Sequence, residues 1–169
     1  MHDENAQRII QIVLEWAKAQ PTIYAVALVG SHARGTARAD SDIDLIVLTT
    51  DSQYFRGDTA WPHAINWNVI ALRPAEWQDE DYGLLWSRRM WLEPNRDEIE
   101  IGFALPSWAD VNPIDPGTQR VIADGCCALH DPKRLLTGLC AGLKGRAAGL
   151  FQNLRILDRP NHPLKNGRF

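Results

Sequence analysis

The sequence is poor in the features that define several classes of protein. Its 169 residues include only three cysteines, of which Cys126 and Cys127 are adjacent. An odd number of cysteines without a Cys-x-x-Cys pair argues against a disulfide framework and against a zinc-cysteine site. No apolar run approaches the ~20 residues that span a bilayer. The segment 1–4 lacks the basic and apolar regions of a signal peptide, so we expect a protein of the reduced cytoplasm.

An excess of one charge is also missing. The chain has 18 Lys+Arg against 21 Asp+Glu, a formal net charge of -3. Proteins that bind nucleic acid or an anionic membrane draw affinity from a basic excess, so neither is an expected partner. The length predicts a single domain, which we place at residues 1–155. A basic C-terminal tail, expected to be flexible, follows at 156–169.

Tryptophan, in contrast, is abundant. Six of the seven tryptophans lie between Trp61 and Trp108, where they build either additional core or a binding pocket. Arg88 and Arg89 stand between Trp86 and Trp91, so this segment is either a patch that stacks on a nucleobase or a hairpin packed on a sheet.

The hydrophobic periodicity predicts a mixed sheet flanked by helices, of the α/β or α+β class, with an added strand hairpin and C-terminal helices. Residues 49–63 are expected to form a loop. The expected helices are 5–20, 73–86, 115–124 and 132–154, and the expected strands are 23–29, 43–48, 65–72, 89–93, 98–105 and 126–129.

Two short segments carry the chemistry. Gly30 and Ser31 end a buried strand and lead into a short helix, which turns backbone N–H groups and a hydroxyl toward one point, as in a phosphate pocket. Arg34 can add donors for the same phosphates. On the next strand, Asp42 and Asp44 share one face with Cβ atoms ~6–7 Å apart. Two carboxylates this close favour a cation between them, and hard oxygen ligands suit Mg²⁺.

The combined pattern, Gly30-Ser31, Arg34-Gly35 and 41–47 (Ser-Asp-Ile-Asp-Leu-Ile-Val), resembles the signature of the polymerase β-like nucleotidyltransferase superfamily. The most similar members are minimal nucleotidyltransferases and the aminoglycoside- or lincosamide-type adenylyltransferases. The resemblance covers residues 26–48 and implies a nucleotidyltransferase fold. It also implies that the nucleotide is bound by Gly30, Ser31, Arg34 and Ser41.

The resemblance further implies a third carboxylate on a neighbouring strand. In the short members it lies on the strand directly after the paired aspartates, where this sequence offers only Asn66 and Asn68. The hydrophobic–acid–hydrophobic pattern recurs at 99–101, so Glu100 is the expected third ligand, with Glu98 on the same strand face as the alternative.

These residues imply a Mg²⁺-dependent nucleotidyltransferase with Asp42, Asp44 and Glu100 as catalytic residues and ligands of two Mg²⁺ ions. It would move a nucleoside monophosphate, AMP from ATP, onto a hydroxyl of a small molecule or protein. Glu98 and Asp115 are candidates for the general base. The alternative is a catalytically inactive or antitoxin-like module that uses the same fold to bind another protein, such as a toxin-like partner.

Overall fold

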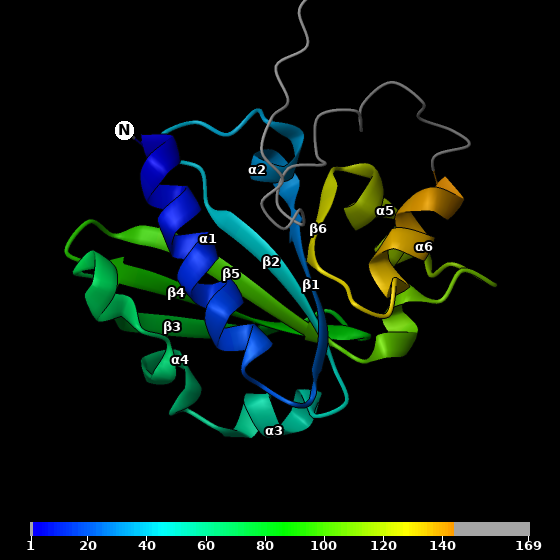
Figure 1. The fold of residues 1–169 in the computed structure, drawn as a ribbon, viewed down its shortest axis with the longest axis horizontal. Helices are drawn as coiled ribbons and strands as arrows, with labels where there is room; N and C mark the ends of the chain where they lie inside the picture. Colours follow the sequence, from blue (N-terminus) through cyan, green and yellow to red (C-terminus); the bar gives the residue numbers. More distant parts are fainter. Residues whose placement is uncertain (1, 144–169) are drawn as a thin grey trace, which may run out of the picture.

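The computed structural model describes residues 2–143, and its centre is one six-stranded mixed sheet (Figure 1). The strand order is β3-β4-β5-β2-β1-β6, and every neighbouring pair is antiparallel except β2 with β5. The sequence expectation of a mixed sheet flanked by helices is confirmed. The strands are β1 (Ile23–Val29), β2 (Ile43–Thr49), β3 (Arg73–Asp81), β4 (Leu85–Glu93), β5 (Asp97–Ala104) and β6 (Cys126–His130).

Two sets of helices cover the two faces of the sheet. One face packs against α1 (His2–Lys18), α3 (Ser52–Gly57), α4 (Trp61–Ala64) and the 3₁₀ turn η1 (Trp67–Ile70). The other packs against the 3₁₀ turn η2 (Pro106–Ala109), α5 (Pro116–Ala123) and α6 (Leu135–Leu143). The remaining helix, α2 (Gly30–Arg34), joins β1 to the loop before β2. No helix within residues 2–143 is long and apolar enough to cross a bilayer.

Alternating residues of the central strands serve two separate cores. Ile43, Leu45 and Val47 of β2 face the α1 side, whereas Ile46 and Leu48 face the α5–α6 side. Asp44 shares the second face with Ile46, and Glu100 shares it with the alternate β5 residues 102 and 104. Within the described residues, the second core takes in no side chain of β3 or β4 as a buried member, so the helices leave this face open beside the two acids.

The sequence expectations are wrong between residues 49 and 86. The expected strand at 65–72 contains η1, because Ile65, Trp67 and Leu72 are buried through a turn rather than on alternate sides of a strand. The expected loop at 49–63 contains α3 and α4.

The expected helix at 73–86 is also wrong, because it forms β3 and the start of β4. Its acidic residues follow a period of two: Trp77 and Asp79 turn toward Arg88, whereas Glu76 and Glu80 lie on the open face. The extended backbone thereby pairs Asp79 with a buried cation, a contact that helical periodicity does not anticipate.

The other expected elements are found close to their expected places. Asp115 caps α5 through an Oδ2 that accepts from the backbone N–H of Thr118 at 2.9 Å. The expected helix at 132–154 is described only for 135–143, and its remainder, like the tail at 156–169, lies outside the described residues.

Most of the tryptophans form core. Trp16, Trp61, Trp67, Trp86 and Trp108 are buried, and Trp86 stacks on Phe103 with ring centroids 4.8 Å apart. Aromatic rings bury large areas and gain further energy from such pairs. Trp61, Trp67 and Trp86 therefore enlarge the core on the α1 side of the sheet, whereas Trp108 belongs to the core on the α5–α6 side.

Arg88 connects this aromatic core with β3, the edge strand of the sheet. Its side chain is only 2% exposed and forms two hydrogen bonds of 2.7 Å with the Asp79 carboxylate. It also donates to the carbonyls of Asp58 and Arg56. Its guanidinium carbon lies 5.4–5.6 Å from the ring centroids of three tryptophans, namely Trp61, Trp77 and Trp86.

We predict that Arg88→Ala lowers the free energy of unfolding by about 3 kcal/mol, because it removes a buried charge and leaves its partners unpaired. Urea unfolding followed by tryptophan fluorescence measures this change. The matched control is Arg73→Ala, which removes an exposed arginine paired with Glu93 and should cost less than ~1 kcal/mol. Equal losses in the two variants would contradict a structural role for Arg88.

Candidate functional site

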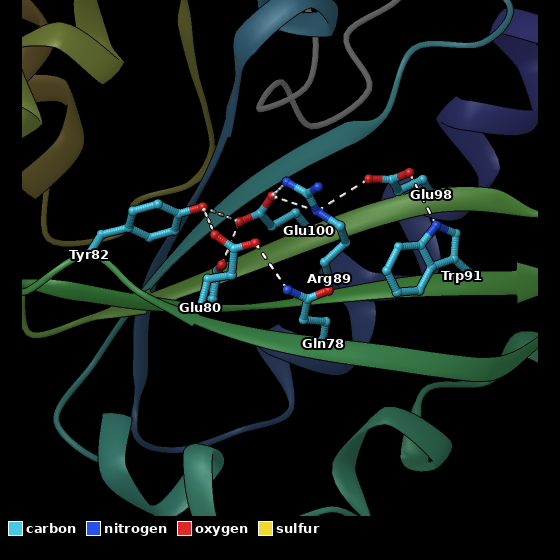
Figure 2. A network of polar contacts seen from close by, with 8 residues as sticks. Gln78, Glu80, Tyr82, Arg89, Trp91, Glu98 and Glu100 are labelled. Atoms are coloured by element: carbon cyan, nitrogen blue, oxygen red, sulfur yellow. Dashed lines mark hydrogen bonds and ion pairs between the residues drawn. The ribbon is translucent and has the colours of Figure 1, made fainter.

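The parallel pairing of β2 with β5 places Asp44 directly beside Glu100. The next strand continues the row, because Arg89 of β4 is the cross-strand partner of Glu100. Gln78 of β3 is in turn the partner of Arg89. Four strands thus contribute one row of polar side chains to the open face of the sheet, and Figure 2 shows the β3–β5 part of it.

Glu100 is held by three neighbours rather than standing free. Its Oε2 accepts from Arg89 Nη2 at 2.7 Å and from Arg89 Nε at 3.2 Å. Its Oε1 accepts a short hydrogen bond from the Ser87 hydroxyl and lies 3.4 Å from the Tyr82 hydroxyl. The Glu100 side chain is only 13% exposed, so these contacts define its position.

Arg89 also neutralises Glu98, the alternative third ligand. Its Nε lies 3.2 Å from Glu98 Oε1, and Glu98 Oε2 accepts from Trp91 Nε1 at 3.2 Å (Figure 2). The two carboxylates, together with the hydrogen bond to Glu100, raise the pKa of Arg89 above its ordinary value. A single guanidinium therefore bridges the two acids that the sequence proposed as competitors for one role.

Gly30 allows the backbone at the end of β1 to approach Asp44 closely. Its φ is +70°, and a Cβ atom there would lie 2.7 Å from Asp44 Oδ2. Any other residue would be strained by the positive φ and would collide with the carboxylate. The requirement for glycine at this position therefore comes from its contact with Asp44.

The other residues of the expected nucleotide-binding motif, Ser31, Arg34 and Ser41, differ in their hydrogen bonding. Ser31 Oγ is buried and has no hydrogen-bond partner, so its hydrogen-bonding capacity is unmet. Arg34 is instead paired with Asp124 of the α5 C-terminus, donating to its carbonyl at 2.6 Å. Ser41 Oγ accepts from the backbone N–H of Arg38 at 2.9 Å, which closes the loop before β2.

A cavity of about 510 Å³ adjoins the site. Gly30, Asp44, Ser87, Glu100 and Tyr82 contribute to its walls, and its apolar side is formed by Ile46, Leu84, Leu85, Trp108 and Val121. This volume lies within the range of small-molecule sites. Asp115, one candidate for the base, also lines the cavity, but its carboxylate is engaged in capping α5.

Burial and like charge act together on Asp44. Burial, then the charges of Asp42 and Glu100, raise the pKa of Asp44 from 3.8 to about 7, and the charge of Arg89 only partly opposes them. Such a carboxylate favours either a proton or a cation. Within residues 2–143, however, no three His, Cys, Asp or Glu side chains are close enough to form a ready-made metal cluster.

Sequence reasoning missed three participants of this site: Ser87, Tyr82 and the Arg89 bridge. Strand periodicity at 85–93 was the available signal, since alternation sends Arg88 to the core and Ser87 and Arg89 to the open face. The prediction of a helix at 73–86 left no place for a strand that begins at residue 85, so this alternation was not recognised. Arg88 and Arg89, for which the sequence left open a stacking patch or a packed hairpin, belong to the β3–β4 hairpin and lie on opposite faces of β4.

The comparison with known families agrees with this geometry. Residues 8–82 match the family model described as nucleotidyltransferase domain. This match covers less than half of the chain; it is consistent with the polymerase β-like nucleotidyltransferase superfamily and supports nucleotidyl transfer as the general activity. The match ends before β4 and β5, so Arg89, Glu98 and Glu100 lie outside it. No curated protein is significantly similar to the chain.

We predict that the metal-free protein loses stability as the pH rises from about 4 to about 7. Over this range the unfolded chain has lost the proton of Asp44, whereas the folded protein still binds it. The free energy of unfolding therefore falls with increasing pH. Below this range both states are protonated and above it both are charged, so the contribution of Asp44 is constant.

Urea unfolding in the presence of EDTA, repeated from pH 4 to pH 8, measures this slope. Asp44→Asn should remove most of it. Asp40→Asn, at an exposed aspartate paired with Arg38, should leave the slope as it is in the unaltered protein. An unchanged slope in Asp44→Asn would show that other groups control it.

Proposed function

We propose that this protein transfers a nucleoside monophosphate, AMP from ATP, to a hydroxyl group of a small molecule or protein in a Mg²⁺-dependent reaction. One observation carries the proposal: Gly30, which follows β1, lies so close to Asp44 that a Cβ atom there would collide with its carboxylate, and Asp44 is in register with Glu100. Gly30 and these two acids line one cavity.

The donor set supports a divalent cation. Asp42 and Asp44 offer hard carboxylate oxygens, the ligands that Mg²⁺ prefers, and burial, followed by the charges of Asp42 and Glu100, raises the pKa of Asp44. We propose Asp42 and Asp44 as the residues that hold Mg²⁺, with Glu100, or alternatively Glu98, completing the set. The chemistry that Mg²⁺ supplies at such a site is neutralisation of phosphate charge.

The chain's own residues account for nucleotide placement. The unpartnered Ser31 hydroxyl and the backbone at Gly30 are the proposed phosphate donors. Arg34 would contribute only by leaving Asp124, and it is therefore a weaker candidate than Ser31. The adjoining cavity has room for the remainder of a bound ligand, since it continues from Gly30 and Asp44 to Trp108.

One observation favours the alternative, a binding module without activity. Arg89 already supplies a positive charge to both Glu98 and Glu100. A protein that had lost its metal would need such a counter-charge to keep two acids stable on one sheet face. In that case, a partner protein would be the ligand of the fold.

We predict that Asp42→Asn abolishes Mg²⁺-dependent nucleotide binding and transfer while the protein stays folded, because it removes one of the two carboxylates at the start of β2. Ser31→Ala should weaken nucleotide binding by about tenfold, the equivalent of about one hydrogen bond. Isothermal titration calorimetry with ATP, GTP, CTP and UTP, with Mg²⁺ or with EDTA, measures both effects.

The matched controls are Asp40→Asn and Ser107→Ala, which change the same residue types away from Gly30 and Asp44. Both should bind nucleotide as the unaltered protein does. Absence of Mg²⁺-dependent binding for all four nucleotides in the unaltered protein would refute the proposed transferase and favour the binding module.

A further inference from the structure

The β3–β4 hairpin presents a tyrosine hydroxyl to the candidate site. Tyr82 lies at the hairpin turn, where its backbone N–H donates to the Leu85 carbonyl at 2.8 Å. Gly83 follows with φ +86°, and its N–H donates to Asp81 Oδ1 at 2.9 Å. Asp81 is in turn bound by Arg56. The turn that carries Tyr82 is therefore fixed by several contacts.

The Tyr82 hydroxyl lies between two carboxylates. It donates to Glu80 Oε2 at 2.9 Å and lies 3.4 Å from Glu100 Oε1. Figure 2 shows the ring extending from the hairpin toward this pair of acids. Tyr82 is one of the walls of the cavity that also contains Gly30 and Asp44. It thus brings a hydroxyl to the cavity that the proposed function assigns to the nucleotide.

We propose that Tyr82 is a nucleotidyl acceptor of this protein, so that the chain modifies itself in cis. This inference rests on the proposed function, because it needs a bound nucleoside triphosphate. The proposed function leaves the acceptor hydroxyl general, and this inference identifies it as the hydroxyl of Tyr82.

The step is a displacement at the α-phosphorus of the bound nucleoside triphosphate. The Tyr82 oxygen forms the new bond to phosphorus, and the bond from phosphorus to the bridging oxygen of the leaving pyrophosphate breaks. The phenolic proton passes to Glu80 Oε2, its hydrogen-bond acceptor. The products are a tyrosine phosphodiester that carries one nucleoside monophosphate, and pyrophosphate.

Exposure and position distinguish Tyr82 from the other hydroxyl groups. The Ser87 hydroxyl also donates to Glu100, but Ser87 is 1% exposed and has no room for an attached nucleotide. Tyr54 is as exposed as Tyr82, at 63% against 56%, but it belongs to α3 and lines a different cavity. Tyr82 combines an exposed ring with a hydroxyl that carboxylates hold in the site.

The test incubates the full chain with Mg²⁺ and each of the four nucleoside triphosphates, followed by intact mass measurement and peptide mapping. We expect one nucleoside monophosphate per chain, on Tyr82. Tyr82→Phe should lose the adduct, because it removes the acceptor oxygen. Tyr54→Phe is the matched control and should be modified as the unaltered protein is.

Two further variants test the details of the step. Glu80→Gln keeps a hydrogen-bond acceptor but not a base, and it should slow adduct formation by about 100-fold. When the active chain is mixed with a tagged Asp42→Asn chain, the tagged chain should stay unmodified if transfer occurs in cis. Labelling of the tagged chain would overturn transfer in cis.

The outcomes separate this inference from the proposed function. Mg²⁺-dependent nucleotide binding without an adduct, or with an adduct on a residue other than Tyr82, overturns self-modification and leaves the transferase proposal in place. Absence of nucleotide binding overturns both. An adduct that persists in Tyr82→Phe also overturns the assignment of Tyr82.

Discussion

The parallel pairing of β2 with β5 is the constraint on which the candidate site depends. It sets Asp44 beside Glu100 although 55 residues of chain separate them, and the intervening segment must leave the sheet and return to it. That segment supplies α3, α4 and the β3–β4 hairpin. A one-residue shift in the register would turn Glu100 into the core on the α1 side. The apolar neighbours Ile99 and Ile101, both fully buried, therefore fix the acid through their own burial.

The alternation of side chains along β4 places its two adjacent arginines on opposite faces of the sheet. Arg88 is buried against tryptophans and Asp79, where it ties the edge strand to the core. Arg89 lies on the open face and balances Glu98 and Glu100. The two arginines thus have different roles: Arg88 stabilises the core, and Arg89 balances charge at the site. Arg89 thus supplies part of the positive charge that offsets the acids on this sheet face.

Sequence patterns were dependable where one periodicity dominated. β1 and β2 follow from continuous apolar runs, β5 from acids that alternate with isoleucines, and α5 from a capping residue followed by proline. All four lie close to where these signals place them. The prediction for segment 65–86 was wrong because its signals conflict: Asn66 and Asn68 alternate as in a strand, but Asn66 precedes the 3₁₀ turn η1 and Asn68 lies within it. Acidic residues 76–81 suggested a solvated helix face, whereas Asp79 is paired with Arg88 across the strands.

The sequence alone determined the pair Asp42 and Asp44 at the start of β2, the glycine-serine turn before them and the nucleotidyltransferase resemblance, because these features are local and need only one strand and its turn. It also indicated Glu100 by its pattern. Only the tertiary structure decided that Glu100 stands in register with Asp44, that Arg89 and Ser87 hold it, and that Tyr82 reaches the same cavity. These relations depend on which strands become neighbours and in what register, and pairing across long stretches of chain is settled by burial of the whole core rather than by any short segment.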